Sequence, residues 1–586
     1  MTFLLGATAL TAPVLAGAAA SPADAHFNAI AKRWLDAEMH ASPIGATQTG
    51  DHRFDHEIDD MSTPARKAQT MLWKRILADL TALDRSKLGR DNQVDAAILS
   101  NRLRHAIWDD EVLESWAWDC RAFSQAAGDA LYGLMSREFA ALPVRMRAAI
   151  SRMEKLPQLF AQMRATLVPA RVPAIYATTL SKQNGGVTSV VDTMVLPHAD
   201  ALTGAEQKRL HMAADTLKKA VGQNQTWIDT VLVPNAKGDF RIGAKLFDEK
   251  LAFTLNSPLT RAEIRAKAEA AVKDTRAAMY EVSRKALAGH ADAPPMPDAP
   301  TDAQQQAVIE AALALAYAVR PARDAVVQTA KDLLAKATDF VRTKNLITLP
   351  DAPVEVVLMP EFARGVAVAY CDSPGPLDKN LKTYFDVMPI PDDWSQAQVD
   401  SFLREYNSYG IQDVAVHEAM PGHFVQLWHA DACPSILRAV LGSGSFIEGW
   451  AVYAEGMMVE QGFRGDEPLY KLSQLKVLLR TVTNAILDQM VHVDGISKED
   501  AMRLMTQVAF QQESEAAGKW VRAQLSSTQL STYFVGVSEH NAIRAEAQKR
   551  AGAAFDLKGY HDKVLSFGNA PARYVRALMF DEPIEA

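Results

Sequence analysis

The chain has 586 residues, with 62 lysines and arginines against 70 aspartates and glutamates, so its formal net charge is −8. Hydrophobic residues make up 48% and charged residues 23%, an ordinary globular composition that excludes a disordered, collagen-like or rod-like coiled-coil protein. A slight acidic excess over so long a chain leaves no basic footprint, which argues against nucleic acid or an anionic membrane as the main partner. Three scattered cysteines exclude a disulfide framework and a cysteine-based metal site.

The N-terminus has the pattern of an export signal. Residues 3–20 are apolar or small and carry no charge, and two small-x-small patterns end at Ala20 and Ala25. The sequence therefore predicts a signal peptide over residues 1–25 and a periplasmic or secreted mature protein over 26–586. The n-region departs from the pattern, because no lysine or arginine precedes Lys32, and the alternative is an alanine-rich tail. No later stretch of about 18 apolar residues suggests a membrane span.

Helical periodicity dominates the rest of the chain. Apolar residues recur at helical spacing at Leu99, Leu103 and Ala106, and again over 264–279. Hydroxyl side chains that stand three residues before a Glu, Gln or Asp, as in a capping box, occur at Thr260, Thr301 and Ser497. A proline-rich segment at 289–300 predicts a loop and the best internal lobe boundary. We therefore expect a mainly α-helical protein.

One region favours strands instead. Three short β-prone runs, at 354–359, 365–370 and 383–388, are separated by turn residues. They predict a small antiparallel sheet. A helix-like run from Ser395 to Tyr406 follows this region and leads to the segment that carries the chemistry.

That segment reads His417-Glu-Ala-Met-Pro-Gly-His423. An adjacent His-Glu on an apolar helix is the opening of a zinc-peptidase motif, in which two imidazoles hold the metal and Glu418 acts as general base. In the simple motif the two histidines stand four positions apart on one helix face, whereas His423 follows His417 by six, about 600° around a straight helix. Pro421 and Gly422 resolve this difference, because they allow the helix to bulge and return His423 to the metal side.

A third ligand comes from the segment after a glycine-rich turn. Catalytic zinc takes three protein ligands and keeps one open position, so Glu448 completes the set with His417 and His423. Because Ser445 and Glu448 could instead form a capping box, Glu455, two turns further on the same face, is the alternative ligand. The one that is not a ligand can orient an imidazole. Zinc follows from the ligand types, and manganese or cobalt would suit the same set.

At these residues the sequence resembles the bacterial family of domain of unknown function 885, from about Phe27 to about Phe580. The matching segments are His417-Glu-Ala-Met-Pro-Gly-His423, Glu448-Gly-Trp-Ala-Val-Tyr-Ala-Glu455, Gly238-Asp-Phe-Arg-Ile-Gly243 and Leu530-Ser-Thr-Tyr533-Phe-Val-Gly536. That family in turn resembles helical zinc metallopeptidases of the oligopeptidase and angiotensin-converting-enzyme kind. Phe424 and Val416 stand where the family often has a further histidine.

The resemblance implies a two-lobed helical clam, with the metal helix in a deep central cleft beside the small sheet. It also implies peptide-bond hydrolysis, in which a side chain from a C-terminal helix donates a hydrogen bond to the developing oxyanion. Tyr533 is the first choice for this donor and His492 the second. We therefore expect an exported zinc metallopeptidase that acts on short peptides. The alternatives are a metal-dependent amidase on a non-peptide amide and a non-catalytic periplasmic peptide-binding protein. The sequence leaves the oligomeric state open.

Overall fold

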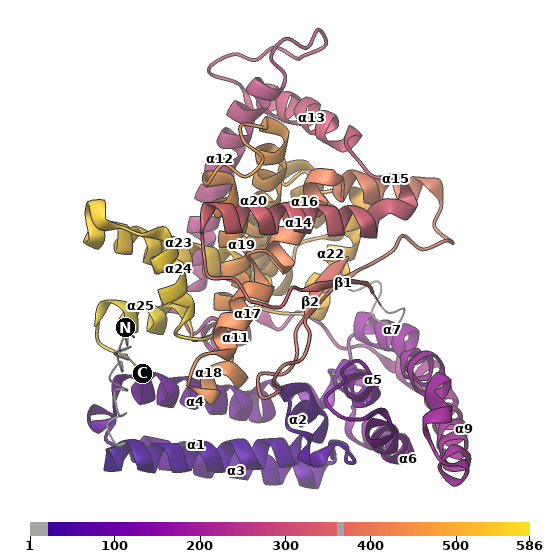
Figure 1. Ribbon diagram of the computed structural model, residues 1–586. Coiled ribbons are helices and arrows are strands. Elements are labelled where there is room, and N and C mark those ends of the chain that lie inside the picture. The colour runs from indigo at the N-terminus through magenta and orange to yellow at the C-terminus, as the bar shows by residue number, and fades with distance from the viewer. Residues whose placement is uncertain (1–20, 360–367, 586) are drawn as a thin grey trace, which may run out of the picture.

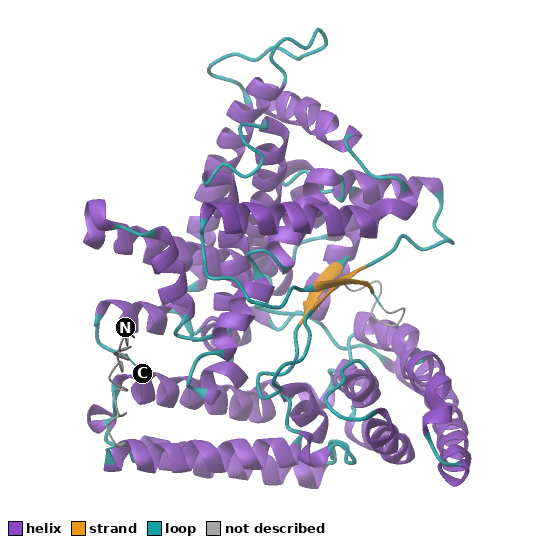
Figure 2. Ribbon diagram, in the orientation of Figure 1, coloured by secondary structure: helices purple, strands orange, loops and turns teal. Residues whose placement is uncertain are grey.

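The computed structural model describes residues 21–359 and 368–585 and is mainly helical, with one small sheet (Figures 1 and 2). The predicted helical class is confirmed. Most of the predicted signal peptide, residues 1–20, lies outside the described residues. Ser21 caps the first helix, which begins at Pro22, so cleavage after Ala20 would leave that helix whole, whereas cleavage after Ala25 would remove its first turn.

Two groups of helices form the first half of the chain, at the bottom of Figure 1. One group buries Phe27, Trp34, Ile76 and Leu99 in a shared core, and the other packs around Leu131, Met153 and Leu217. The helices of this half are α1 (Pro22–Ala41), α2 (Pro43–Thr49), α3 (Thr63–Thr81), α4 (Arg90–Trp108), α5 (Arg121–Met135), α6 (Leu142–Thr166), α7 (Ala174–Gln183), α8 (Gly186–Val190), α9 (Gly204–Trp227) and α10 (Val233–Asn235).

The next helices begin where the capping signals predict. Thr260 and Thr301 form complete capping boxes with Glu263 and Gln304. The predicted loop at 289–300 joins two helices that pack into one hydrophobic cluster, through Met279 on one side and Val308 on the other, so it does not separate two cores. The helices are α11 (Gly243–Leu255), α12 (Arg261–Ala286), α13 (Asp302–Ala318) and α14 (Val326–Lys344).

The sheet is where the sequence prediction needs correction. Its strands are β1 (Glu355–Leu358), β2 (Ala369–Asp372) and β3 (Tyr384–Val387), in the order β1-β3-β2. β3 pairs antiparallel with β2 but parallel with β1, so the sheet is mixed rather than antiparallel. The prediction was wrong because β3 inserts between the two earlier strands. Part of the predicted middle run, 365–367, lies outside the described residues.

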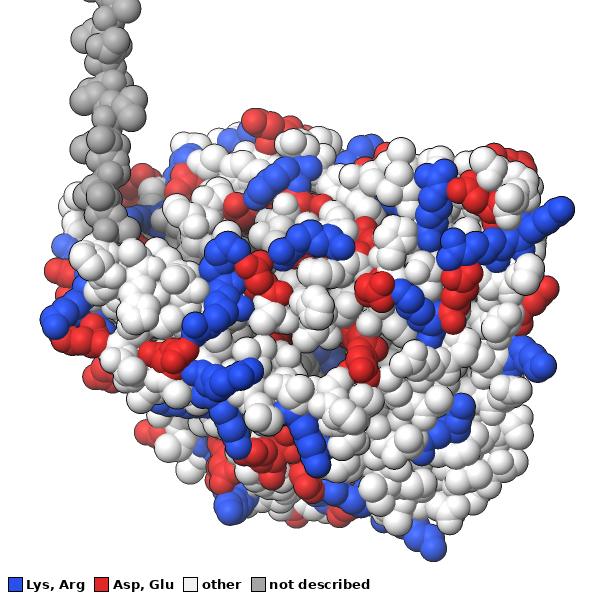
Figure 3. All heavy atoms as spheres, turned by 90° about the horizontal axis from the view of Figure 1, so that it is seen from below, with Lys and Arg blue, Asp and Glu red and all other residues white. Residues whose placement is uncertain are grey.

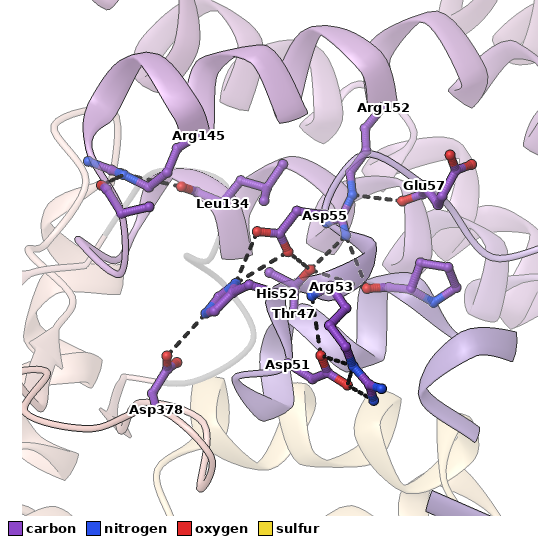
Figure 4. Close-up of polar contacts among 12 residues, drawn as sticks. Thr47, Asp51, His52, Arg53, Asp55, Glu57, Leu134, Arg145, Arg152 and Asp378 are labelled. Atoms are coloured by element: carbon purple, nitrogen blue, oxygen red, sulfur yellow. Dashed lines mark hydrogen bonds and ion pairs between the residues drawn. The ribbon is translucent and has the colours of Figure 1, made fainter. Parts of the chain in front are cut away.

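The loop from 373 to 383, between β2 and β3, reaches the N-terminal helices. Its Leu377 N–H donates to the Thr49 carbonyl over 2.9 Å. His52 lies between Asp378 of this loop and Asp55 of its own segment, with separations of 3.1 and 3.0 Å (Figure 4). The strand connection thus ties the sheet to α2 and the segment that follows it.

The remaining helices form the centre of the molecule and its C-terminal part, in orange to yellow in Figure 1. Those nearest the sheet share the largest core cluster with it, around Phe385, Val416 and Trp450. The helices are α15 (Gln396–Glu405), α16 (Ser408–Glu418), α17 (His423–Asp431), α18 (Ile436–Val440), α19 (Gly444–Glu460), α20 (Pro468–Gln489), α21 (Lys498–Arg503), α22 (Glu513–Leu525), α23 (Ser531–Ala551), α24 (Leu557–Leu565) and α25 (Ala572–Phe580).

Acidic and basic side chains are interspersed on the face seen in Figure 3. Within the described residues, none of the helices has a long enough apolar stretch to cross a bilayer. The predicted two-lobed clam with a deep central cleft stays a prediction.

Candidate metal centre

The two histidines stand on either side of a helix break. His417 and Glu418 end α16, and His423 begins α17. At the break the Gly422 N–H donates to the Val416 carbonyl over 2.9 Å. A Cβ added to Gly422 would lie 1.8 Å from the His417 carbonyl oxygen, so only glycine fits there. The break brings the two imidazole centroids to 4.8 Å with their planes 87° apart, as the predicted bulge requires.

Close packing of α19 on α23 presents Glu448 beside these rings. A Cβ added to Gly449 would lie 2.4 Å from the Gly536 carbonyl carbon, so the two helix backbones touch there. Ser443, rather than Ser445, caps α19 by accepting the Phe446 N–H. The competing capping role for Glu448 is therefore not realised, and its carboxylate faces the histidines.

The three side chains converge with the separations of a metal site. The Nε2 atoms of His417 and His423 lie 3.6 and 3.5 Å from Oε2 of Glu448. These distances are long for hydrogen bonds, whereas ligands about 2.0–2.2 Å from a tetrahedral metal lie about 3.3–3.6 Å apart. One donor atom from each residue lies within 4.8 Å of the others. His417, His423 and Glu448 can therefore hold a metal ion.

Glu455 orients the first imidazole. Its Oε1 lies 2.7 Å from Nδ1 of His417, on the side of the ring that faces away from Glu448, which is how a carboxylate fixes a metal-ligating histidine. Burial disfavours a protonated His417, but Glu448, Glu455 and Glu418 outweigh that effect and raise the pKa of the ring. Burial and the nearby Glu455 raise the pKa of Asp413. Asp413 is thus held toward its neutral form, whereas the three glutamates around His417 supply negative charge that favours a bound cation.

Glu418 lies beside the metal-ligand group on the wall of a cavity of about 950 Å³. Its Oε2 accepts the Cys371 N–H from β2 over 3.1 Å, which holds the carboxylate between the end of α16 and the sheet. Ala369, Tyr370 and Cys371 of β2 line the same cavity. A carboxylate in this position can accept a proton from a water bound next to it.

Tyr533, on the first turn of α23, also lines the cavity. Its hydroxyl oxygen accepts from Nη2 of Arg522 over 2.9 Å and from Nε2 of Gln529 over 3.3 Å, which leaves the hydroxyl proton free to donate. Burial and the charge of Glu448 raise the pKa of Tyr533. The structure thus brings Tyr533 to the wall that carries the metal ligands.

His492, the second predicted oxyanion donor, is placed elsewhere. It is buried, its Nε2 lies 2.8 and 2.6 Å from the backbone carbonyls of Ala523 and Ser526, and it is not among the residues that line the cavity. Asp488, one helical turn before His492, accepts hydrogen bonds from Thr528 and Ser531. This placement argues against the catalytic role predicted for His492, because its ring joins helices rather than facing the cavity.

The lysine and arginine side chains that line the cavity escaped the sequence analysis, namely Arg480, Lys519 and Arg522. The spacing of Glu515, Lys519 and Arg522 is that of an ordinary solvated helix face. No local signal distinguishes Lys519 from its neighbours on α22, because only the packing of the folded chain buries it in the cavity wall.

Comparisons with known proteins agree with this fold. The chain is similar to the solved structure of a predicted lipoprotein of unknown function from Shewanella oneidensis, at 31% identity and a TM-score of 0.78, covering 94% of this chain and 99% of that one. It also shares the fold of a predicted lipoprotein from Colwellia psychrerythraea, at 16% identity and a TM-score of 0.77, covering 95% and 98%. No curated protein matches the chain. A family model described as "Bacterial protein of unknown function (DUF885)" matches residues 43–579, so the chain belongs to that family.

Proposed function

We propose that this protein is a zinc-dependent peptidase that hydrolyses short peptides. The observation that carries the proposal is the convergence of His417, His423 and Glu448 around one point, with Glu418 beside them on the wall of a cavity of about 950 Å³. Two histidines and one glutamate are a ligand set of catalytic zinc sites, which keep a further position open. When bound there, the ion supplies the Lewis acidity that activates a water and polarises a carbonyl.

The residues around this point have the chemistry that amide hydrolysis needs. Glu418 accepts the proton of the attacking water on its carboxylate and passes it to the nitrogen of the leaving amine as the C–N bond breaks. Tyr533 donates its free hydroxyl proton in a hydrogen bond to the carbonyl oxygen as that oxygen gains negative charge. Glu455 keeps the His417 ring in one orientation throughout.

The sheet supplies a guide for the substrate backbone. β2 pairs with β3 along one edge only in the described sheet, and three of its residues line the cavity. An extended peptide can pair with the outer edge of β2 through main-chain hydrogen bonds, which fix its register without selecting side chains. A cavity of about 950 Å³ favours short peptides over folded proteins.

Export is part of the proposal. The uncharged residues 3–20 and the small-residue patterns at Ala20 and Ala25 support a cleaved signal peptide, and the similar structure from Shewanella oneidensis is described as a lipoprotein. We expect the protein in the cell envelope or the medium, which fractionation of expressing cells would test.

The first test is metal analysis of the purified protein beside a digest of a peptide library read by mass spectrometry. We expect one zinc ion per chain and cleavage of short peptides that a chelator abolishes and added zinc restores. Hydrolysis limited to non-peptide amides would instead identify a metal-dependent amidase. Binding of metal and peptides without turnover would identify a non-catalytic binding protein.

The role of Glu418 gives a sharper prediction. Glu418→Gln should lower turnover about 10²–10⁴-fold, because the amide cannot accept the proton of the attacking water. It should leave the zinc content unchanged, since Glu418 is not among the three converging ligands. Glu460→Gln, at an exposed position at the end of α19, is the matched control and should change neither quantity. Loss of zinc from the Glu418 variant would show that this residue is a ligand and that the assigned roles are wrong.

A further inference from the structure

A second group of charged side chains lines the same cavity. Arg480 comes from α20, and Lys519 and Arg522 come from α22. All three are cations within the wall that also carries the metal ligands. Whether nearby carboxylates neutralise these three cations decides whether the cavity can also bind an anion.

Lys519 is the least compensated of the three. It is only 6% exposed, and its Nζ makes no hydrogen bond within the described residues. Its ion-pair contact, Oε1 of Glu515, is 4.0 Å away. That oxygen also faces Arg480 Nη1 at 3.3 Å, and the other oxygen of Glu515 accepts from Tyr406 over 3.0 Å. One carboxylate therefore serves both the buried Lys519 and the partly buried Arg480.

The next acidic side chain does not restore the balance. Oε2 of Glu405 is already engaged, because it lies 2.8 Å from Nζ of Lys476 and accepts the Gln512 N–H over 2.9 Å, and the effect of Glu405 on Lys519 is smaller than that of Glu515. Burial, with Arg480 nearby, lowers the pKa of Lys519 to about 7 although Glu515 opposes the change. Burying an ammonium that shares its one carboxylate with another cation costs free energy, unless a further anion binds beside it.

Arg522 links this cation to the reacting centre. Its Nη2 donates to the hydroxyl of Tyr533, and its charge acts on Lys519. Tyr533 in turn lies close enough to Glu448 for that charge to raise its pKa. An anion held between Lys519 and Arg522 therefore lies near the metal ligands, along the cavity rather than on a separate surface.

We propose that Lys519 and Arg522 bind the C-terminal carboxylate of a peptide, so that the enzyme removes one or two residues from the C-terminal end. This inference rests on the proposed peptidase function. A carboxylate suits the planar fork of an arginine beside an ammonium, and every unmodified short peptide carries one at its end. An acidic side chain of the substrate offers the same chemistry, so the test must separate these two sources.

The test compares three versions of one peptide: a free acid, its C-terminal amide, and the amide with a glutamate near the end. We expect kcat/KM for the amide to be about 100-fold lower than for the free acid, since the buried cation then lacks its partner. N-acetylation should have little effect, and the products should be single residues or dipeptides from the C-terminus. If kcat/KM for the glutamate-containing amide equals or exceeds that for the free acid, the pocket binds an acidic side chain and the proposal fails.

Lys519→Met tests the residue itself. The ratio of kcat/KM for free acid to that for amide should fall from about 100 to less than about 10, because the pocket loses its buried cation. The loss should appear mainly in KM. Lys471→Met, at an exposed position on α20, is the control and should keep the wild-type ratio. Unchanged zinc content and melting temperature in both variants would show that folding is not the cause, and an unchanged ratio in Lys519→Met would overturn the assignment.

A binding measurement separates failure of this inference from failure of the proposed function. In Glu418→Gln, calorimetry should show the free acid binding at least about 10-fold more tightly than the amide. Cleavage of both peptides at equal rates, or at sites unrelated to the C-terminus, would overturn the inference and leave the peptidase function standing. Selective binding of the free acid by a protein that cleaves no peptide would overturn the peptidase function alone.

Discussion

Glu448 and Glu455 stand two turns apart on α19, and their surroundings give them different roles. Glu448 approaches the Nε2 atoms of both histidines, whereas Glu455 contacts only Nδ1 of His417. Glu455 is 1% exposed and its Oε2 has no hydrogen-bond partner within the described residues. Its carboxylate therefore serves the imidazole, and Glu448 is left to complete the ligand set.

Substituting the two glutamates separates these roles. Glu455→Gln should weaken zinc affinity about 10–100-fold, because an amide fixes the imidazole less firmly than a carboxylate. Glu448→Gln should weaken it further, since a direct ligand is lost. Competition with a chelator of known affinity measures both, and Glu460→Gln again serves as the unchanged reference. A variant at 455 that loses zinc more completely than the one at 448 would reverse the two assignments.

At the scale of elements, the connection between β2 and β3 couples the sheet to the N-terminal helices. His52 lies between Asp55 and Asp378 and stacks on Phe139 with ring centroids 3.6 Å apart. The Thr47 hydroxyl donates to Asp55 and accepts from Arg152, so the Arg152 guanidinium is linked to Asp55 through Thr47 (Figure 4). Burial lowers the pKa of His52, but Asp55 and Asp378 outweigh it, and the pKa is raised overall.

A raised folded-state pKa fixes the sign of the pH dependence. The stabilisation from protonated His52 is complete below the unfolded pKa of about 6.5 and is lost as the pH rises through the folded value. His52→Gln should therefore lower the free energy of unfolding by about 1–2 kcal/mol at pH 5.5 and by less at pH 9.

Urea unfolding at the two pH values measures this difference. His56→Gln, a change at an exposed histidine of the same segment, should show the same small effect at both. An equal loss at pH 5.5 and pH 9 for the His52 variant would show that its charge contributes nothing to the connection.

At the scale of the whole molecule, the three candidate metal ligands come from separate helices of one large core. His417 ends α16, His423 begins α17 and Glu448 lies on α19, and all three helices contribute to the same hydrophobic cluster as the sheet. A cation that binds only this folded arrangement stabilises it by mass action.

Removing the metal should therefore lower the melting temperature. At a zinc concentration about 1,000-fold above Kd the stabilisation is about 4 kcal/mol, which for a chain of this size corresponds to a shift on the order of 3 °C. Scanning calorimetry with and without a chelator measures it, and added zinc should restore the higher value. The Glu448→Gln variant should show a much smaller shift, because its zinc affinity is lower, and a chelator effect of equal size there would place the stabilising metal elsewhere.

The sequence by itself determined the features that depend on neighbouring residues. Thr260 and Thr301 start their helices where predicted, because a capping box forms within a single turn. The break between His417 and His423 follows from Pro421 and Gly422, since both limit the same few peptide units. The family and the three candidate ligands were predicted for the same reason: their signal lies in short, contiguous motifs.

Only the tertiary structure decided what depends on distant contacts. β3 inserts between β1 and β2, which no pattern within the strands specifies. The placement of Glu448 and Glu455 depends on the contact between Gly449 and Gly536, and Lys519 lines the cavity only because of how α22 packs in the folded chain. Side chains far apart in the chain meet through packing. The free energy of that packing is distributed over many residues, so no single segment of the sequence predicts it.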